Sequence, residues 1–194
     1  NQAGDGVWNV QTNPLHFGGG IYAKDSTLVY IQSSMFLRNH AGLGGGITSD
    51  NCNANITDSL FFENHAYQWG GGGAHLFSDA TSDQFVDVKD TRFVRNVANS
   101  DGGAIGLYGY ASSNYYHVRL IRCNLVENQA KSNNPNGGSS SPYGGGGIYV
   151  QRNGQLVARE SRFIRNEALK NYGHQIYTYK DHRVPIVFII NTLI

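Results

Sequence analysis

Charged side chains are scarce in this chain. Only 15% of its 194 residues are Asp, Glu, Lys or Arg, and the formal net charge at pH 7 is +1. Typical soluble domains carry about 25% charged residues. No basic stretch stands out, so the composition gives no electrostatic reason to expect a nucleic-acid partner.

Long apolar runs are also missing. A membrane-spanning helix needs about 20 consecutive apolar residues. The longest candidate, residues 184–190, has only the length of a strand. We therefore expect no membrane span within this segment.

What the chain does have is 25 glycines and an internal repeat. Five copies of an eight-residue motif place Phe or Leu third and Asn sixth; they are residues 34–41, 59–66, 91–98, 123–130 and 161–168. Each copy follows, at a variable distance, two glycines and a small or aliphatic residue; these triplets are residues 19–21, 45–47, 72–74, 102–104 and 146–148. The chain also begins and stops within a repeat. We expect residues 1–194 to form one segment, a slice of a longer array.

The spacing inside each repeat predicts strands. The residues seven and five positions before the Phe site are aliphatic in every copy, as in Val86 and Val88, and the residue between them varies. This period of two is typical of a strand with one buried face. The Gly-Gly-aliphatic triplet indicates a second short strand, and the Phe-x-x-Asn piece a third that ends in a turn. The variable joins indicate loops at residues 5–18, 76–85, 106–117 and 131–145.

Short strands, glycine corners and one turn of chain per repeat predict an all-β fold, a right-handed single-stranded parallel β-helix. We expect about five full coils, with partial coils at both ends. Equivalent residues would then stack about 4.8 Å apart.

Two stacks are readable. The first is an asparagine ladder of Asn39, Asn64, Asn96, Asn128 and Asn166. Asparagine suits a ladder because its amide both donates and accepts, and because it tolerates left-handed turn geometry. The residues just before the asparagines alternate in sign, being Arg38, Glu63, Arg95, Glu127 and Arg165. Such alternation predicts direct contact between neighbouring coils.

The double glycine paired with Phe-x-x-Asn resembles the repeats of polymorphic outer membrane proteins, which are chlamydial autotransporter adhesins. More broadly it is similar to the right-handed β-helix, or pectin-lyase-like, superfamily. The motifs cover nearly the whole chain, with Leu125 replacing Phe once. The resemblance implies an extracellular or cell-surface location and a structural or adhesive role. It names no ligand. We expect carbohydrate or protein partners at the surface, and, because the chain begins and stops within a repeat, further coils of the same chain or other copies at both ends.

Polysaccharide lyases and hydrolases share this fold, which makes catalysis the main alternative. A lyase needs clustered carboxylates and a base on one face. Asp58, Asp90, Arg122 and Glu160 fall at the same position of successive coils and would form such a groove. Ser33 holds that position in another coil, which favours an ordinary exposed polar column. An extracellular filament assembled end to end is a further alternative.

His40 and His65 stack in the same way and would be close enough to share a metal ion. Other coils hold Val97 and Gln129 at that position, which favours a surface column instead. We expect no metal site and no cofactor.

Aromatic side chains are the better functional candidates. Trp8, Tyr67, Trp69 and Tyr143 occur in the joins after the Asn turn, and Tyr108, Tyr110, Tyr115 and Tyr116 crowd the 106–117 loop. Exposed Trp and Tyr in polar loops suit stacking on sugar rings or on a protein partner. The alternative, that these loops bury their own aromatics against the coils, stays open.

The two cysteines and one sequon bear on the compartment. Cys123 falls in a buried column of small residues and should be an inert core thiol. Cys52 lies in a loop at another position around the coil, so it should not pair with Cys123 and could pair outside this segment. Asn55 begins the only Asn-x-Thr sequon and faces outward from its strand, which makes it the expected glycosylation site if the source is eukaryotic.

Overall fold

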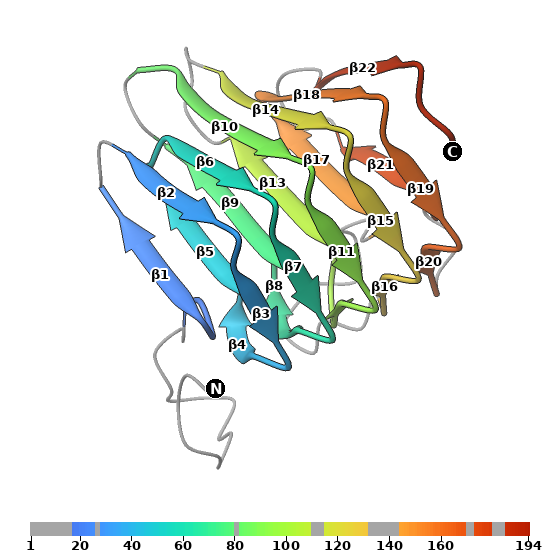
Figure 1. The fold of residues 1–194 in the computed structure, drawn as a ribbon, viewed down its shortest axis with the longest axis horizontal. Coiled ribbons are helices and arrows are strands. Elements are labelled where there is room, and N and C mark those ends of the chain that lie inside the picture. The colour runs from blue at the N-terminus through green and yellow to red at the C-terminus, as the bar shows by residue number, and fades with distance from the viewer. Residues whose placement is uncertain are drawn as a thin grey trace.

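The computed structural model describes residues 17–25, 28–79, 82–109, 115–131, 144–169, 173–179 and 185–194. Within these ranges all regular elements are short parallel strands that stack coil on coil (Figure 1). The protein is a right-handed parallel β-helix, which confirms the predicted fold class. Strands β1 to β20 complete five coils, and β21 and β22 begin a sixth. The described residues include no helix long and apolar enough to cross a membrane.

Each full coil contributes one strand to each of four sheets, which we number in the order that the chain visits them. Sheet I contains β1 (Ile21–Lys24), β5 (Ile47–Asp50), β9 (Ala74–Ser78), β13 (Ile105–Gly109), β17 (Ile148–Arg152) and β21 (Ile176–Tyr179). Sheet II contains β2 (Val29–Gln32), β6 (Ala54–Thr57), β10 (Gln84–Lys89), β14 (Tyr116–Ile121), β18 (Gly154–Arg159) and β22 (Ile186–Ile190).

The two remaining sheets flank the asparagine turn. Sheet III contains β3 (Met35–Leu37), β7 (Leu60–Phe62), β11 (Arg92–Val94), β15 (Asn124–Val126) and β19 (Arg162–Ile164). Sheet IV contains β4 (His40–Leu43), β8 (His65–Trp69), β12 (Val97–Ala98), β16 (Gln129–Ala130) and β20 (Glu167–Ala168). The sequence predicted the first three strands of each coil but not the fourth. Sheet IV strands are as short as two residues, too short to show a period.

The core is built from stacked columns of like side chains. Val86 and Val88 of β10 are buried, and Asp87 between them is not, as the alternation predicted. The ring centroids of Phe36 and Phe61, and of Phe61 and Phe93, are 4.6 Å apart with nearly parallel planes. Residues of the Phe column therefore fill the same space in one coil after another.

Two of the predicted loops are shorter than expected. Strand β9 continues to Ser78 and β10 begins at Gln84, while β13 continues to Gly109 and β14 begins at Tyr116. These residues pair in register with the next coil, for example Phe77 with Tyr108. Pairing with a neighbouring coil extended the strands past the point where the repeat motif ends.

Glycine pairs mark places where a side chain would not fit. A Cβ on Gly46 would lie 2.8 Å from Cδ1 of Phe61 and 2.6 Å from the carbonyl oxygen of Gly73 in the next coil. Gly44, at the corner just before, has a φ of +56°, a conformation that favours glycine. Gly46 is thus required because the Phe61 ring leaves no room for a side chain. Gly44 is required because the backbone at this corner is left-handed.

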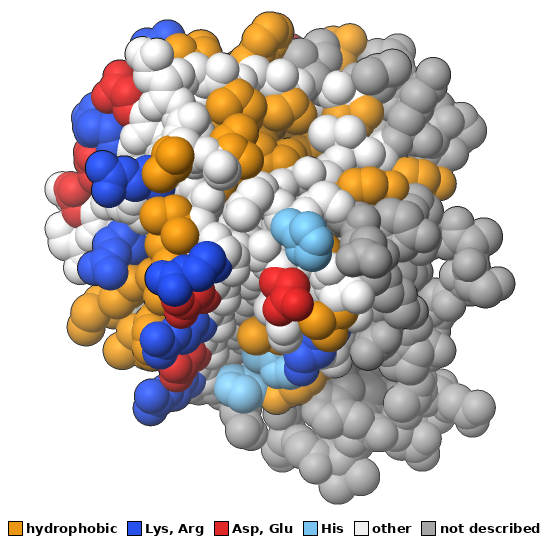
Figure 2. Space-filling view, turned by 90° about the vertical axis from the view of Figure 1, so that its right-hand side faces the viewer, with side chains coloured by type: hydrophobic (Ala, Val, Ile, Leu, Met, Phe, Trp, Pro, Cys, Tyr) orange, Lys and Arg blue, Asp and Glu red, His pale blue; other side chains and the backbone are white. Residues whose placement is uncertain are grey.

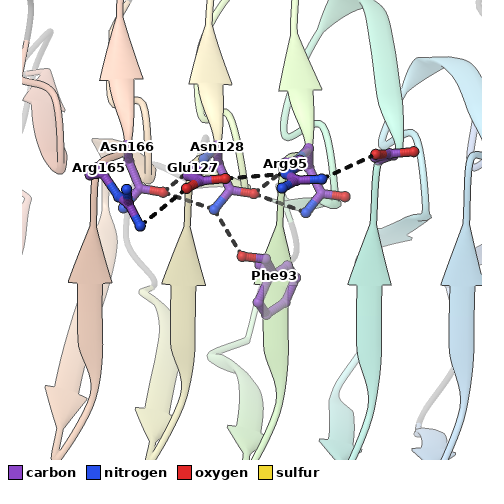
Figure 3. Close-up of polar contacts among 8 residues, drawn as sticks. Phe93, Arg95, Glu127, Asn128, Arg165 and Asn166 are labelled. Atoms are coloured by element: carbon purple, nitrogen blue, oxygen red, sulfur yellow. Dashed lines mark hydrogen bonds and ion pairs between the residues drawn. The ribbon is translucent and has the colours of Figure 1, made fainter.

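The asparagine ladder is continuous through five coils. Figure 3 shows the part of it that contains Asn128 and Asn166. The side-chain nitrogen of Asn96 donates to Oδ1 of Asn128 at 2.9 Å and to the carbonyl oxygen of Phe61 at 3.0 Å. Its Oδ1 accepts from both the backbone and the side-chain nitrogens of Asn64. Asn96 is completely buried, so these bonds satisfy polar groups that water cannot reach.

The left-handed residue of this turn is the charged residue, not the asparagine as the sequence suggested. Arg95 and Glu127 have φ of 54° and 56°, and the other three charged residues of the column are similar. The asparagine side chain is needed inside the turn, where it bonds two coils. The left-handed bend therefore falls on the preceding residue, whose side chain points out to solvent.

The charged side chains that follow from this bend form a continuous surface ladder. Arg38 and Glu63 are 2.8 Å apart, Glu63 and Arg95 3.8 Å, Arg95 and Glu127 3.1 Å, and Glu127 and Arg165 3.3 Å. Basic and acidic side chains alternate along this edge of the molecule (Figures 2 and 3). The contact between neighbouring coils that the alternation predicted is present.

Both cysteines are free and buried. Cys123 donates through Sγ to the carbonyl oxygen of Val88 at 3.3 Å, and burial raises the pKa of its thiol to about 11, as expected for an inert core thiol. The expectation that Cys52 could pair outside this segment is wrong. Its side chain has no exposed surface, and its Sγ donates to the carbonyl oxygen of Asp50 at 3.1 Å, because the short connection from β5 to β6 turns it inward.

Replacing one rung tests the asparagine ladder. Asn96→Ala should lower the free energy of unfolding by at least about 2 kcal/mol, because it removes the acceptor of the buried backbone and side-chain nitrogens of Asn64 and a donor to the carbonyl oxygen of Phe61. Urea denaturation measures this loss. The matched control is Asn124→Ala on sheet III, which should change stability by no more than about 0.5 kcal/mol. Equal effects of the two variants would contradict the role of the ladder.

Reversing one charge tests the surface ladder. Glu127→Arg replaces two attractions by two repulsions, and we expect a loss of about 1 kcal/mol or less at low ionic strength. Because these groups are exposed, 1 M NaCl should remove most of the loss. Thermal unfolding at both salt concentrations measures it. A loss that salt does not change would mean that the backbone bend, and not the charge, had been disturbed.

Candidate functional site

A cavity of about 630 Å³ lies on the outer face of sheet I. Ligand pockets typically have volumes of about 300–1,000 Å³. The described residues that line it are Phe17, Leu43, Thr48, Asp50, Trp69, His75, Phe77, Asp79, Ser100, Asp101, Tyr108, Tyr149, Gln151 and Tyr179. Aromatic rings and carboxylates dominate this list.

Eight of these fourteen residues come from the outward positions of sheet I. Strand alternation sends Leu76, Leu107 and Val150 into the core, and their neighbours in the chain face the other way. Two outward rows result. One contains Thr48, His75, Gly106 and Tyr149, and the other contains Asp50, Phe77, Tyr108 and Gln151. The ends of β4 and β8 on sheet IV, and the connections around the sheet I strands, supply the remaining side chains.

Gly106 shapes the floor of this pocket. It stands in the row where its neighbours have large side chains, and a Cβ there would lie 2.6 Å from Cε2 of Tyr108. The missing side chain lets the Tyr108 ring lie close to His75, with ring centroids 4.8 Å apart, and to Tyr149, at 5.5 Å. The three rings form one aromatic surface.

Two carboxyl groups of the pocket are held out of water. Asp101 is 4% exposed, and burial raises its pKa, although hydrogen bonds from Tyr108, Ser100 and the backbone of Gly70 offset part of the effect. Burial likewise raises the pKa of Asp50. Carboxyl groups in such a setting gain from a ligand that donates to them, because their contact with water is already lost.

Burial lowers the pKa of the His75 imidazole strongly. It is 6% exposed, and burial lowers its pKa to about 3, so the imidazole is neutral at pH 7. Among the described residues its Nδ1 has no hydrogen-bond partner. A neutral imidazole can hydrogen-bond a ligand without adding positive charge to the site.

The pocket contains two of the predicted aromatic residues. Trp69, at the end of β8, is 47% exposed, and Tyr108 is 5% exposed in the second outward row. Trp8, Tyr110 and Tyr143 lie outside the described residues. Tyr108 belongs to strand β13 rather than to a loop, because the strand continues past the double-glycine motif.

The remaining predicted aromatics lie elsewhere. Tyr116 is wrongly predicted as a loop residue for ligand contact: it starts strand β14, is 1% exposed and belongs to the core. Tyr115, just before it, lies near the ring of His117, at 6.0 Å between centroids. Tyr67 lies on sheet IV. It hydrogen-bonds Nδ1 of His40, and its ring centroid is 4.3 Å from that of His65.

The stacked histidines of sheet IV are occupied by these neighbours. Nε2 of His65 contacts Oδ1 of Asn99 at 3.0 Å, and His40 contacts the Tyr67 hydroxyl. Burial lowers the pKa of both imidazoles. Among the described residues, no group of three or more His, Cys, Asp or Glu side chains is placed to hold a metal ion.

The four residues of the catalytic alternative do share one column, at the bend between sheets II and III. Asp58, Asp90, Arg122 and Glu160 all have left-handed φ of 48° to 51° and point outward. Arg122 binds Asp90 through two hydrogen bonds of 2.7 Å, and this lowers the pKa of the carboxyl group and raises that of the guanidinium group. Both groups therefore keep their charges, which suits a surface ion pair better than proton transfer.

The expected glycosylation residue, Asn55, lies in β6 between Tyr30 and Asp87 of the neighbouring coils and is partly exposed. Its modification stays a prediction.

Sequence reasoning missed Asp50, His75, Asp101 and Tyr149. Three of them follow from the alternation of inward and outward side chains in the strand after each double glycine. Asp50, His75 and Tyr149 stand at outward positions of these sheet I strands. Asp101 belongs to a connection of variable length, where the repeat offers no position to compare.

Comparisons of the chain with models of known protein families, with curated proteins and with solved structures find no match. The architecture and the pocket geometry therefore carry the functional argument.

The buried His75 predicts a measurable pH dependence of stability. In the unfolded chain the His75 imidazole is protonated below about pH 6.5, its ordinary pKa. In the folded protein it is protonated only near pH 3, because burial lowers its pKa to about 3. His75 therefore destabilises the fold as pH falls below 6.5, by at most about 1.4 kcal/mol per pH unit. His75→Gln should lose up to about 2 kcal/mol less than the native protein between pH 7 and pH 5, measured by urea denaturation.

The buried carboxyl groups act in the opposite direction, because their folded pKa values are raised. They are present in both proteins, so their effect cancels in the comparison. Identical pH profiles of the native protein and His75→Gln would show that His75 takes up a proton in the folded state.

Proposed function

We propose that this chain is a non-catalytic binding segment of a secreted or cell-surface β-helix protein, and that it binds a glycan in the sheet I pocket. The observation that carries the proposal is the pocket lining, in which Trp69, Phe77, Tyr108 and Tyr149 surround a cavity of about 630 Å³ beside buried polar groups. Aromatic faces stack on the apolar faces of sugar rings, and carboxylates accept hydrogen bonds from sugar hydroxyls.

The likeness of the repeats to the pectin-lyase-like superfamily and to polymorphic outer membrane proteins supports this proposal. The parallel β-helix is the architecture that such repeats build, and a structural or adhesive role at the surface is what the resemblance implies. The distribution of side chains favours binding over turnover. The only column proposed for a lyase contains the Asp90–Arg122 ion pair on the exposed bend, away from the pocket residues.

The enzymatic alternative and the end-to-end filament stay predictions. A polysaccharide lyase would release unsaturated products from polyuronates, and that activity would disappear in Asp90→Asn or Arg122→Gln. The proposed binding segment should release none.

Trp69 offers the sharpest test, because a half-exposed ring can be removed without opening the core. A glycan array with the purified chain should identify a bound glycan, and titration calorimetry should then measure its affinity. Trp69→Ala should weaken binding at least tenfold, since it removes a stacking surface.

The matched control is Tyr30→Ala, which removes an aromatic ring that is 74% exposed on sheet II, outside the pocket. It should leave affinity unchanged. A chain that binds no glycan, or one whose affinity falls equally in both variants, would contradict the proposal.

A further inference from the structure

The carboxyl groups of the sheet I pocket limit which kinds of ligand can bind there. Three carboxyl groups line it, from Asp50 at the end of β5, Asp79 just after β9 and Asp101 just before β13. Among the described lining residues there is no Lys or Arg. A pocket built this way repels a ligand that carries carboxylate groups.

Charged groups near the pocket offset the negative charge of its carboxyl groups only in part. Lys24 of β1 lies 3.8 Å from Oδ2 of Asp50, but its side chain is 54% exposed. The Tyr22 hydroxyl donates to the same oxygen at 3.3 Å, and Asp25 lies close enough to act in the opposite sense. Asp79 accepts a hydrogen bond from the neutral Asn51 amide at 2.7 Å.

Asp101 has neutral partners only. Ser100 donates to it at 2.8 Å, and Tyr108 and the backbone of Gly70 also contribute hydrogen bonds. In the described part of the chain neither Asp79 nor Asp101 forms a salt bridge. Among the described residues, no cation therefore neutralises Asp79 or Asp101, and Lys24 is the partner of Asp50 alone.

The rest of the lining suits a cation as well. The neutral His75 adds no repulsion, and its Nδ1 is a buried polar atom without a partner among the described residues. The Tyr108 and Tyr149 rings stand 5.5 Å apart at an angle of 43°, so both present faces and edges to the same space. Ring faces attract ammonium groups, and most strongly where water is excluded.

From these features together we propose that the pocket selects a glycan that carries protonated amino groups, such as a chain of 2-amino-2-deoxy sugars. This inference rests on the proposed glycan-binding function and specifies its ligand class. The sugar rings stack on the aromatic surface while an ammonium group donates to the carboxylates of Asp79 and Asp101. Polyuronates, which carry the opposite charge, are excluded.

Binding should also depend on pH in a bell-shaped way. A bound ammonium group favours the ionised carboxylates, so affinity falls at low pH as Asp50 and Asp101 become protonated. Because burial raises the pKa values of these groups, that fall begins above their ordinary titration range. At high pH the amino groups of the ligand lose their protons, and affinity falls again.

The experiment compares three soluble oligosaccharides of equal length by calorimetry at pH 6: a glucosamine tetramer, an N-acetylglucosamine tetramer and a galacturonate tetramer. The first two differ only in the acetyl groups that remove the positive charge. We expect the glucosamine tetramer to bind at least tenfold more tightly than its acetylated form, and the galacturonate tetramer not to bind.

Two variants locate the effect. Asp79→Asn changes an exposed residue, so it should fold normally and weaken glucosamine binding at least threefold. Asp101→Asn, which keeps the shape of a buried group, should weaken it more. The control Asp87→Asn makes the same change in net charge on the outer face of sheet II and should have no effect. Far-UV circular dichroism checks that each variant is folded.

The outcomes separate this inference from the proposed function. Equal affinity for the acetylated tetramer, tighter binding of galacturonate, or no difference between Asp79→Asn and Asp87→Asn would overturn the charge selection and leave glycan binding in place. If none of the three tetramers binds while the array identifies another glycan, the charge selection fails alone. If the array also identifies none, both proposals fail.

Discussion

Parallel hydrogen bonding between successive coils is the interaction on which the rest of this structure depends. It holds equivalent residues of neighbouring coils a fixed short distance apart, so every side chain meets the side chain at the same position of the next coil. Phenylalanine rings satisfy this by stacking at 4.6 Å, and asparagines by bonding amide to amide. In one surface column, charged residues satisfy it by alternating in sign. The Arg95 and Glu127 positions show that constraint at the surface.

The same constraint explains where the backbone bends. A coil must turn a corner at the same place as the coils beside it, and a side chain that points inward there has no room. The structure uses glycine at the corner before sheet I and lets charged residues adopt left-handed φ at the corners around sheet III. Those outward charges resemble a catalytic groove when read in sequence. In space, Asp90 and Arg122 neutralise each other along an exposed edge.

The proposed function depends on the face where side chains do not repeat. The core columns and the ladders are nearly invariant from coil to coil, but the outward rows of sheet I change from Thr48 to His75 to Tyr149. The scaffold tolerates that change because its stability is supplied by the other columns. The result is a local cavity in a regular solenoid, with aromatic rings and carboxyl groups that come from several coils.

The amino-acid sequence alone determined the fold class, the asparagine ladder and the alternation of charge, because each is a repeated local pattern that only stacking explains. It also identified Trp69 and Tyr108 as candidate contact residues. Only the tertiary structure decided that Tyr116 faces the core and that Cys52 is buried. It alone brought Asp101 to His75 and Tyr149, which are far apart in the chain. The physical reason is that pairing between coils sets where a strand ends, and that boundary decides which side chains face outward together.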